Sequence, residues 1–354
     1  MQPWRSRTGR HPLWATLVLA LAAAGCFHSE PAAKLGKDQR SEQPSVVAQS
    51  RLTAQPLLDE AAGVVRAYWQ ARGLAFSIRE AAPLRDHEDG AAASLSGGVI
   101  EDAHANGNPP SQNLTLSEIH VYVPRPERFP RVFLAAVTAT DPDTSPEIYL
   151  VVFTKGARQA PWKASWWVKY ANNTPLPSIV VDQDGFATQL APSQQRRVLV
   201  TDAVTVERRL RDYLTQAEET DTPPRSGFFT DTADTYGTVK ANEAFKKQSA
   251  QNGVAVGQSL KDARLPGFAC LTRDGALFAV TIRADKLVGF LASPLVQDAN
   301  QIQADRRIPP GSYRAVLYRY LATYAIQVPR TGSTDPRAVA VASSWSVTAV
   351  TART

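Results

Sequence analysis

The sequence predicts an α+β fold in which helices pack on mainly antiparallel sheets. An amphipathic helical stripe precedes a series of strands joined by short turns, and this order of elements occurs twice along the chain. The length of 354 residues suggests two domains at a typical size of about 150 residues each. A hydrophobic content of 44% lets each domain bury a core. We therefore expect an N-terminal α+β domain at 53–195 and a C-terminal α+β domain at 196–354.

Residues 1–25 have the pattern of a secretory signal peptide. Arginines precede an apolar run from Leu13 to Ala24, and small residues and Cys26 follow. The run is too short to span a bilayer, which needs about 20 residues. The box Ala23–Cys26 resembles the lipobox of bacterial lipoproteins, which implies that the Cys26 thiol is acylated and that cleavage occurs before it. The alternative is an ordinary signal that is cleaved after Ala24 and releases a soluble protein.

Residues 26–52 are polar and mixed in charge, without apolar periodicity. This composition predicts a flexible tether between a lipidated Cys26 and the folded body. We expect the protein to be held through this anchor on the extracytoplasmic face of the cell membrane. The second cysteine, Cys270, lies in an apolar stretch and has no disulfide partner once Cys26 is lipidated, so we expect a buried structural thiol.

The N-terminal half begins with a helix that we expect to start near Thr53 and to stop at Gly73. Its apolar face follows i, i+3, i+4 spacing. Residues 90–110 are rich in Gly, Ala, Asn and Pro, which predicts a loop. Strands are expected at 119–123, 131–140, 148–153 and 162–170.

The strand at 162–170 suggests a binding surface. Strict alternation places Trp162, Ala164, Trp166, Val168 and Tyr170 on one face, and places Lys163, Trp167 and Lys169 on the other. A tryptophan flanked by two lysines on an open face suits an acidic cell-wall glycan or an envelope protein. The alternative is that the tether or the other domain covers this face.

The C-terminal half repeats the order of elements. A helical stripe begins near Thr201, residues 221–266 are polar with a weak helix at 241–249, and strands are expected at 268–272, 276–282, 313–328 and 338–351. Tyrosines 318, 320 and 324 share a strand face, which we interpret as core packing. A helix across a curved sheet of about four strands resembles the cystatin-like or nuclear-transport-factor-like cone.

A search for catalytic and metal-binding patterns yields no site. No Gly-x-Ser-x-Gly elbow or phosphate-binding loop is present. The run Asp182–Gly185 resembles the start of a calcium loop, but the twelfth position is Ser193, so we expect a turn. The charged run 86–89 is interpreted as a solvated loop. We predict no catalytic residue, no metal and no cofactor. The net charge of +6 falls to about +3 without Arg5, Arg7 and Arg10 of the predicted leader, which is too weak and too scattered a charge to indicate nucleic-acid binding.

Four stretches carry a resemblance that covers roughly residues 53–350: Val65–Trp69, Trp162–Tyr170, Ser178–Thr188 and Leu271–Val280. They resemble a group of uncharacterised actinobacterial secreted lipoproteins, which implies an envelope location and no site residue beyond Cys26. We expect a non-catalytic binding or scaffolding role. The alternative is an envelope enzyme with an acid/base site in a cone-like pocket, which clustered carboxylates and histidines would favour.

Overall fold

The computed structural model describes residues 54–106, 115–140, 146–170, 176–216, 225–262, 268–291, 293–297 and 305–354. Residues Arg51–Thr354 form one compact unit. The predicted signal peptide at 1–25, the tether at 26–52 and Cys26 lie outside the described residues. Within the described ranges, no helix combines the length and the apolar character that crossing a membrane requires.

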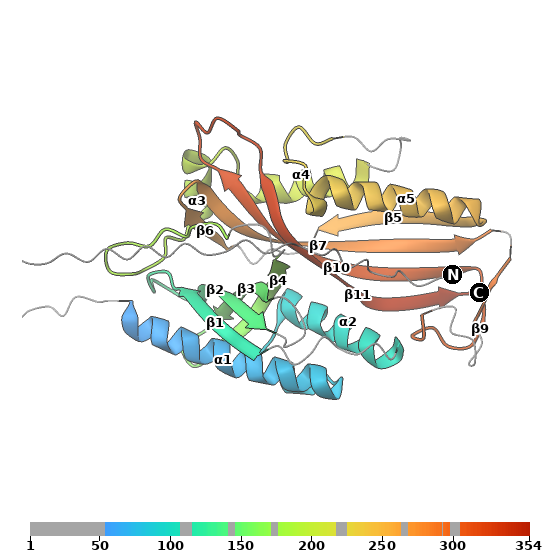
Figure 1. The fold of residues 1–354 in the computed structure, drawn as a ribbon, viewed down its shortest axis with the longest axis horizontal. Helices are drawn as coiled ribbons and strands as arrows, with labels where there is room; N and C mark the ends of the chain where they lie inside the picture. The colour runs from blue at the N-terminus through green and yellow to red at the C-terminus, as the bar shows by residue number, and fades with distance from the viewer. Residues whose placement is uncertain are drawn as a thin grey trace, which may run out of the picture. The chain divides into compact units, whose positions relative to one another are not determined.

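A large antiparallel sheet dominates the described residues (Figure 1). Its nine strands run in the order β1-β2-β3-β4-β11-β10-β7-β5, with β6 paired to β7, and each pairing between neighbouring strands is antiparallel. Their bounds are β1 Thr115–Tyr122, β2 Arg131–Thr140, β3 Glu147–Lys155, β4 Lys163–Tyr170, β5 Val254–Asp262, β6 Ala269–Thr272, β7 Gly275–Phe290, β10 Ala315–Pro329 and β11 Val339–Arg353. A separate short hairpin pairs β8 Leu295–Gln297 with β9 Gly311–Tyr313.

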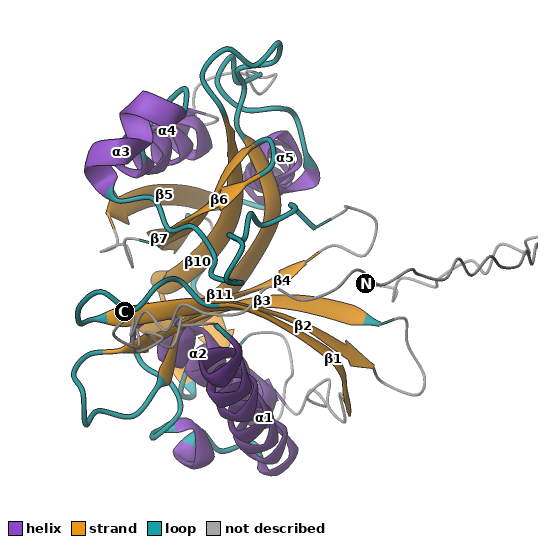
Figure 2. Ribbon diagram, turned by 90° about the vertical axis from the view of Figure 1, so that its left-hand side faces the viewer, coloured by secondary structure: helices purple, strands orange, loops and turns teal. Residues whose placement is uncertain are grey.

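The helices lie in two groups (Figure 2). Helices α1 and α2 cover one face of β1–β4, whereas α3, α4 and α5 lie beside β5, β7 and β10. Their bounds are α1 Gln55–Ile78, α2 Gly90–Asn106, α3 Pro192–Val198, α4 Ala203–Gln216 and α5 Thr238–Gln251, with a 3-10 turn at Ala82–Leu84 and the π-helical turn η2 at Ala233–Gly237. Helices on an antiparallel sheet confirm the predicted α+β class.

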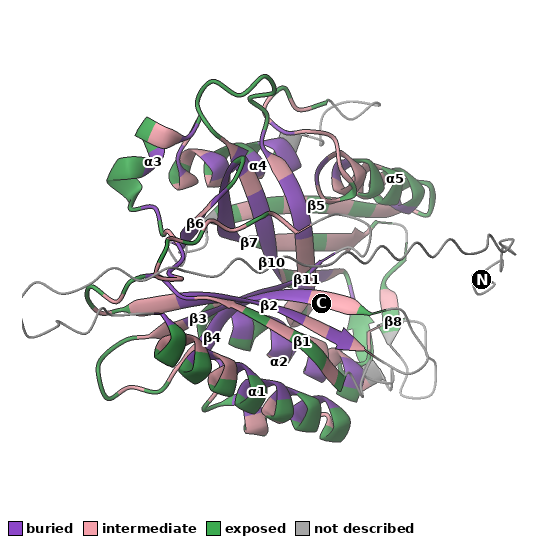
Figure 3. Ribbon diagram, turned by 60° about the vertical axis from the view of Figure 1, so that its left-hand side comes forward, coloured by how far each residue is buried: buried purple, intermediate pink, exposed green. Residues whose placement is uncertain are grey.

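The hydrophobic core lies on both faces of the central strands (Figure 3). One cluster fills the space between α1, α2 and the strands β2–β4. A second cluster lies between α4 and the strands β6, β7 and β10. A third joins the other face of β2–β4 to β6, β7 and β11. Strands β2–β4 are therefore buried on both sides, which alternation alone did not predict.

Helix α2 occupies the segment for which the composition predicted a loop, so that prediction is wrong. The small residues have a packing role rather than a turn role. A Cβ atom on Gly98 would lie 2.5 Å from the Ser346 hydroxyl oxygen and 2.5 Å from the Val347 carbonyl oxygen on β11. Because glycine and alanine carry so little side chain, this helix approaches the sheet closely and buries Leu95 and Ile100.

Helix α1 also extends beyond its predicted end. It continues past Gly73 and stops at Arg79, which adopts the left-handed conformation with φ +57°. The predicted strands at 131–140 and 162–170 are confirmed as β2 and β4. Helix α3 and strand β5 lie in polar segments where the sequence pattern predicted neither.

The predicted halves share one sheet, because Tyr170 of β4 pairs with Ala342 of β11. The proposed boundary between residues 195 and 196 falls inside α3. The division at that boundary and the cone-like shape of each half stay predictions.

Candidate functional site

A partly enclosed cavity lies between the helical segment η2–α5 and the sheet. Its volume is about 420 Å³, and its lining comes from η2, α5, β5, β7, β10 and β11. In Figure 1, α5 runs alongside β5, above the strands that form the opposite wall. Cavities of about 300–1,000 Å³ that hold a few polar groups are typical of small-molecule sites.

The strand register sets the long axis of this cavity. Lys286 of β7 lies opposite Tyr318 of β10, and Ser343 of β11 lies opposite Tyr324 of the same strand. The backbone positions of these two lining residues are therefore six steps apart along β10, which is about 20 Å at the rise of a β-strand. Between these ends, the sheet contributes Ala284 and the aromatic side chains of Tyr320 and Trp345, so the middle of this wall is mainly apolar.

Lys286 marks one end of the cavity. Its Nζ atom lies 4.8 Å from the ring centroid of Phe245 on α5 and 5.5 Å from that of Tyr320. Burial lowers the pKa of Lys286, and the neighbouring charge of Lys246 lowers it further. No carboxylate among the described residues pairs with this ammonium group. The two aromatic faces therefore provide favourable cation–π contacts to this half-buried charge.

Asp234 marks the other end. It lies in the π-helical turn η2 and accepts a hydrogen bond from the Ser343 hydroxyl group. Burial raises the pKa of Asp234, although the bond from Ser343 favours its charged form. The turn is closed by Thr235, whose hydroxyl donates to the carbonyl oxygen of Thr230 at 2.9 Å. Single π-helical turns frequently occur at functional sites.

A second cavity of about 570 Å³ lies beside the segment 123–132. Its arginine Arg125 already donates to the carboxylates of Asp182 at 2.7 Å and Asp184 at 2.6 Å. The Asp182 carboxylate also accepts backbone N–H groups from Asp184 and Phe186. The predicted turn at Asp182–Gly185 is confirmed, with Gly185 at φ +88°. Because the guanidinium group of Arg125 is already paired with these carboxylates, it is not free to bind an anionic ligand.

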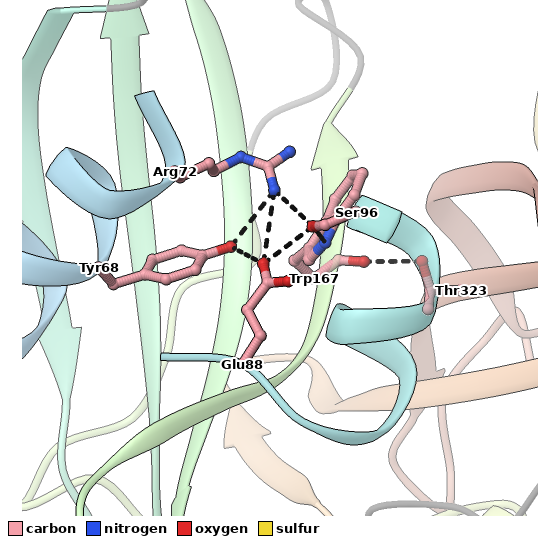
Figure 4. Close-up of polar contacts among 6 residues, drawn as sticks. All are labelled: Tyr68, Arg72, Glu88, Ser96, Trp167 and Thr323. Atoms are coloured by element: carbon pink, nitrogen blue, oxygen red, sulfur yellow. Dashed lines mark hydrogen bonds and ion pairs between the residues drawn. The ribbon is translucent and has the colours of Figure 1, made fainter. Parts of the chain in front are cut away.

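A buried polar cluster joins the two N-terminal helices to β4 (Figure 4). Tyr68 and Ser96 both donate hydrogen bonds to Oε1 of Glu88, at 2.8 and 2.9 Å. Arg72 donates to Ser96 at 2.8 Å and lies 3.6 Å from the same carboxylate oxygen. The guanidinium group also stacks 4.5 Å from the ring centroids of Phe76 and of Trp167. This cluster crosslinks α1, α2 and β4 inside the core.

The second oxygen of Glu88, Oε2, is buried without a hydrogen-bond partner. Burial raises the pKa of Glu88 to about 7, although Arg72 and the two hydroxyl donors favour the charged form. The prediction that the run 86–89 is wholly solvated is therefore wrong, because Glu88 is only 4% exposed. Among the described residues, no group of three or more potential ligands is placed to hold a metal ion.

Trp167 belongs to this cluster and not to an open surface. It is 6% exposed, and its indole N–H donates to Ser96 at 3.2 Å. The physical reason is that both faces of β4 are covered: Trp166 packs in the cluster with β6, β7 and β11, and Trp167 packs in the cluster with α1 and α2. A β-bulge at Ser165 also breaks the predicted alternation, and it places Ala164 on the same face as Trp167.

The two lysines beside Trp167 also have internal partners. Lys163 donates to the backbone carbonyl oxygen of Arg85 at 2.9 Å, and Lys169 forms an ion pair with Glu147. The exposed face predicted for Lys163, Trp167 and Lys169 is wrong, because Trp167 is buried in the cluster formed with helices α1 and α2. A glycan or partner protein therefore has no tryptophan to contact at this place.

The sequence pattern did not predict either of the ionisable residues, Asp234 and Lys286, that lie toward the two ends of the cavity. Asp234 lies in a polar segment that predicted only a weak helix, and Lys286 lies beyond the predicted end of its strand. The available signal was the stripe of tyrosines on β10, of which Tyr320 lines the cavity. The predicted burial of Cys270 is confirmed, and burial raises the pKa of this thiol to about 12.

The fold and the cavity define an α+β protein whose helices cover an extended antiparallel sheet. Residues 57–351 match the family described as Domain of unknown function (DUF8094), and the chain belongs to this family. It is also similar to Uncharacterized lipoprotein SCO2278 of Streptomyces coelicolor, at 28% identity over 175 residues, which are 48% of this chain and 46% of that protein. The alignment thus covers less than half of either protein. No solved structure matches.

These comparisons confirm the resemblance to uncharacterised actinobacterial lipoproteins.

Proposed function

We propose that this protein is a lipid-anchored protein of the cell envelope that binds a small molecule in the cavity between η2–α5 and the sheet. The observation that carries the proposal is a cavity of about 420 Å³ with aromatic side chains between two ionisable groups. Toward one end lies the ammonium group of Lys286, with which no carboxylate of the described residues pairs, and toward the other lies the carboxyl group of Asp234. An anionic ligand group would give this half-buried ammonium group a counter-charge.

The anchor rests on two independent supports. The small-residue box that ends at Cys26 has the residue types that lipoprotein processing needs, and the name of the Streptomyces coelicolor relative describes it as a lipoprotein. Two acyl chains on one cysteine give stable membrane attachment. The side of the membrane and the tether at 26–52 belong to the same proposal.

Binding is favoured over catalysis by the placement of the ionisable groups. Proton transfer requires an acid or base within about 3 Å of the reacting atom, directly or through one water molecule. Lys286 and the Ser343 that binds Asp234 lie opposite positions of β10 that are about 20 Å apart along the strand. Their separation does not suit joint action on one bond. Of the described residues that line the cavity, none is a histidine and one, Asp234, carries a carboxylate.

The binding proposal is tested by filling the cavity from its helical wall. Ala241 is an exposed residue of α5 that lines the cavity, so Ala241→Trp places an indole in the ligand space without changing the core. The matched control is Ala244→Trp, because Ala244 is exposed on the same helix but does not line the cavity. Each protein is purified from membranes of its host, and released small molecules are identified by mass spectrometry.

We expect the wild-type protein and the Ala244→Trp control to carry the same molecule, and we expect Ala241→Trp to lack it. A wild-type protein without any bound molecule, or equal loading of the two variants, would contradict a ligand site here.

The anchor is tested separately. Changing Cys26 to Ala should move the protein from the membrane fraction to the medium or leave an unprocessed precursor. Unchanged processing and membrane association would contradict lipidation.

A further inference from the structure

The two ends and the middle of the cavity differ in chemistry. On the sheet wall the polar side chains lie toward the ends: Gln258 of β5 lies opposite Lys286, and Ser343 lies beside Asp234. Between them, the wall from the sheet consists of Ala284 and the two aromatic side chains described above. The helical wall adds Thr238 and Asn242. An elongated ligand with a polar head and an apolar body fits this distribution. A compact polar ligand would instead place polar groups against the apolar side chains of the middle, where they find no hydrogen-bond partner.

The small residues keep the middle of the cavity open. The helical segment contributes Ala233 and Gly237 of η2 and Ala241 of α5 to the lining, and the sheet contributes Ala284. These side chains are too small to occupy much of the space. Together with Tyr320 and Trp345 they give the cavity an apolar surface that suits an alkyl chain.

The charge at the Lys286 end selects the head group. Its ammonium group lies between the rings of Phe245 and Tyr320 and has no carboxylate partner among the described residues. Burial and the charge of Lys246 both disfavour the positive charge of Lys286. An anionic ligand group at this end would stabilise that charge and so offset both effects. A cationic head group would add a third positive charge near Lys286 and Lys246.

We infer that the ligand is a single-chain organic acid, with its carboxylate at Lys286 and its alkyl chain along Tyr320 and Trp345. This inference rests on the proposed function and names the ligand class. At the far end, Asp234 carries a raised pKa and accepts from Ser343, so this end accommodates either the chain terminus or a hydroxyl group. No covalent change of the ligand is involved.

The experiment compares three probes with the same chain and different heads: dodecanoate, dodecanol and dodecyltrimethylammonium, each below its micelle concentration. Affinities are measured by titration calorimetry on the delipidated protein, for the wild type and two lysine variants. Lys286→Gln removes the charge in the cavity. Lys261→Gln is the matched control, because Lys261 lies on neighbouring β5 and pairs with Asp285, whose side chain points to the opposite sheet face from Lys286.

We expect the wild type to bind dodecanoate at least tenfold more tightly than dodecanol, and not to bind the trimethylammonium probe. Lys286→Gln should remove the preference for dodecanoate and leave dodecanol binding within a factor of about two, whereas Lys261→Gln should change neither. Equal affinity for all three heads, or a preference for dodecanoate that survives Lys286→Gln, would overturn the inference.

The outcomes also separate this inference from the proposed function. If the protein binds none of the three probes but carries a molecule that Ala241→Trp removes, the cavity is a ligand site and the ligand class is wrong. If neither the probes nor a native molecule binds, the proposed function fails as well. Equal melting temperatures of Lys286→Gln and the wild type would exclude unfolding as the cause of lost binding.

Discussion

Replacing Glu88 by Gln tests the buried polar cluster through the pH dependence of stability. The glutamine keeps the shape of the side chain and still accepts from Tyr68 and Ser96, but it cannot ionise. In the folded protein the pKa of Glu88 is raised to about 7 by burial, from its ordinary value of 4.5. This separation corresponds to about 3 kcal/mol between the two protonation states.

The sign follows from proton binding. Because the folded protein holds the Glu88 proton more tightly than the unfolded chain, the contribution to stability is complete below pH about 4.5 and is lost as the pH rises through about 7. The Gln variant has no such loss. Its amide group at the position of Oε2 lacks an acceptor, which costs about 1–3 kcal/mol at every pH.

The assay is urea unfolding of the wild type, Glu88→Gln and Glu80→Gln at pH 5, 6, 7 and 8. Glu80 is an exposed residue just after α1, so its variant is the matched control. We expect the free energy of unfolding of Glu88→Gln to rise relative to the wild type by about 2–3 kcal/mol between pH 5 and pH 8. Other titrating groups cancel in this difference. Parallel profiles of the wild type and Glu88→Gln would refute the reasoning.

Three further predictions concern packing. Trp167→Ala should reduce the free energy of unfolding by about 3–5 kcal/mol in urea titration, because it removes a buried indole and one partner of Ser96; a change below 1 kcal/mol would place Trp167 outside the core. Gly98→Ala should lower the free energy of unfolding by about 1–3 kcal/mol, because its Cβ atom clashes with β11. Gly97→Ala should raise it by about 0.5–1 kcal/mol, because open space surrounds its Cβ atom. Equal effects of the two substitutions would contradict the close approach of α2 to the sheet. Cys270 should resist an impermeant alkylating reagent until urea unfolds the protein, and rapid native labelling would show that the thiol is accessible.

Local sequence pattern was sufficient for the elements whose burial repeats with a simple period. The strands β2 and β3 are uninterrupted apolar segments between turn residues, and α4 has one apolar stripe ending in polar residues. These patterns depend only on side-chain spacing along one element. The same argument predicted a buried Cys270 and the turn that contains Gly185.

The candidate site could not be predicted in this way, because its members come from six elements that the tertiary structure brings together. Nothing near Asp234 in sequence indicates Lys286 or Trp345. Only the strand order β11-β10-β7-β5 places them along one cavity.

The sequence by itself determined the α+β class, the leader pattern ending at Cys26 and most of the central strands, because each depends on composition or on a local period. The tertiary structure decided which faces are covered. Helices α1 and α2 cover the face of β4 that carries Trp167, so this side chain is buried although its side of the strand was predicted correctly. The segment that contains Gly98 was predicted as a loop from its composition, but it is a helix that packs closely on β11. Whether a side chain is buried depends on which other element of the fold packs against it. The pattern of residues within one element carries no information about that other element.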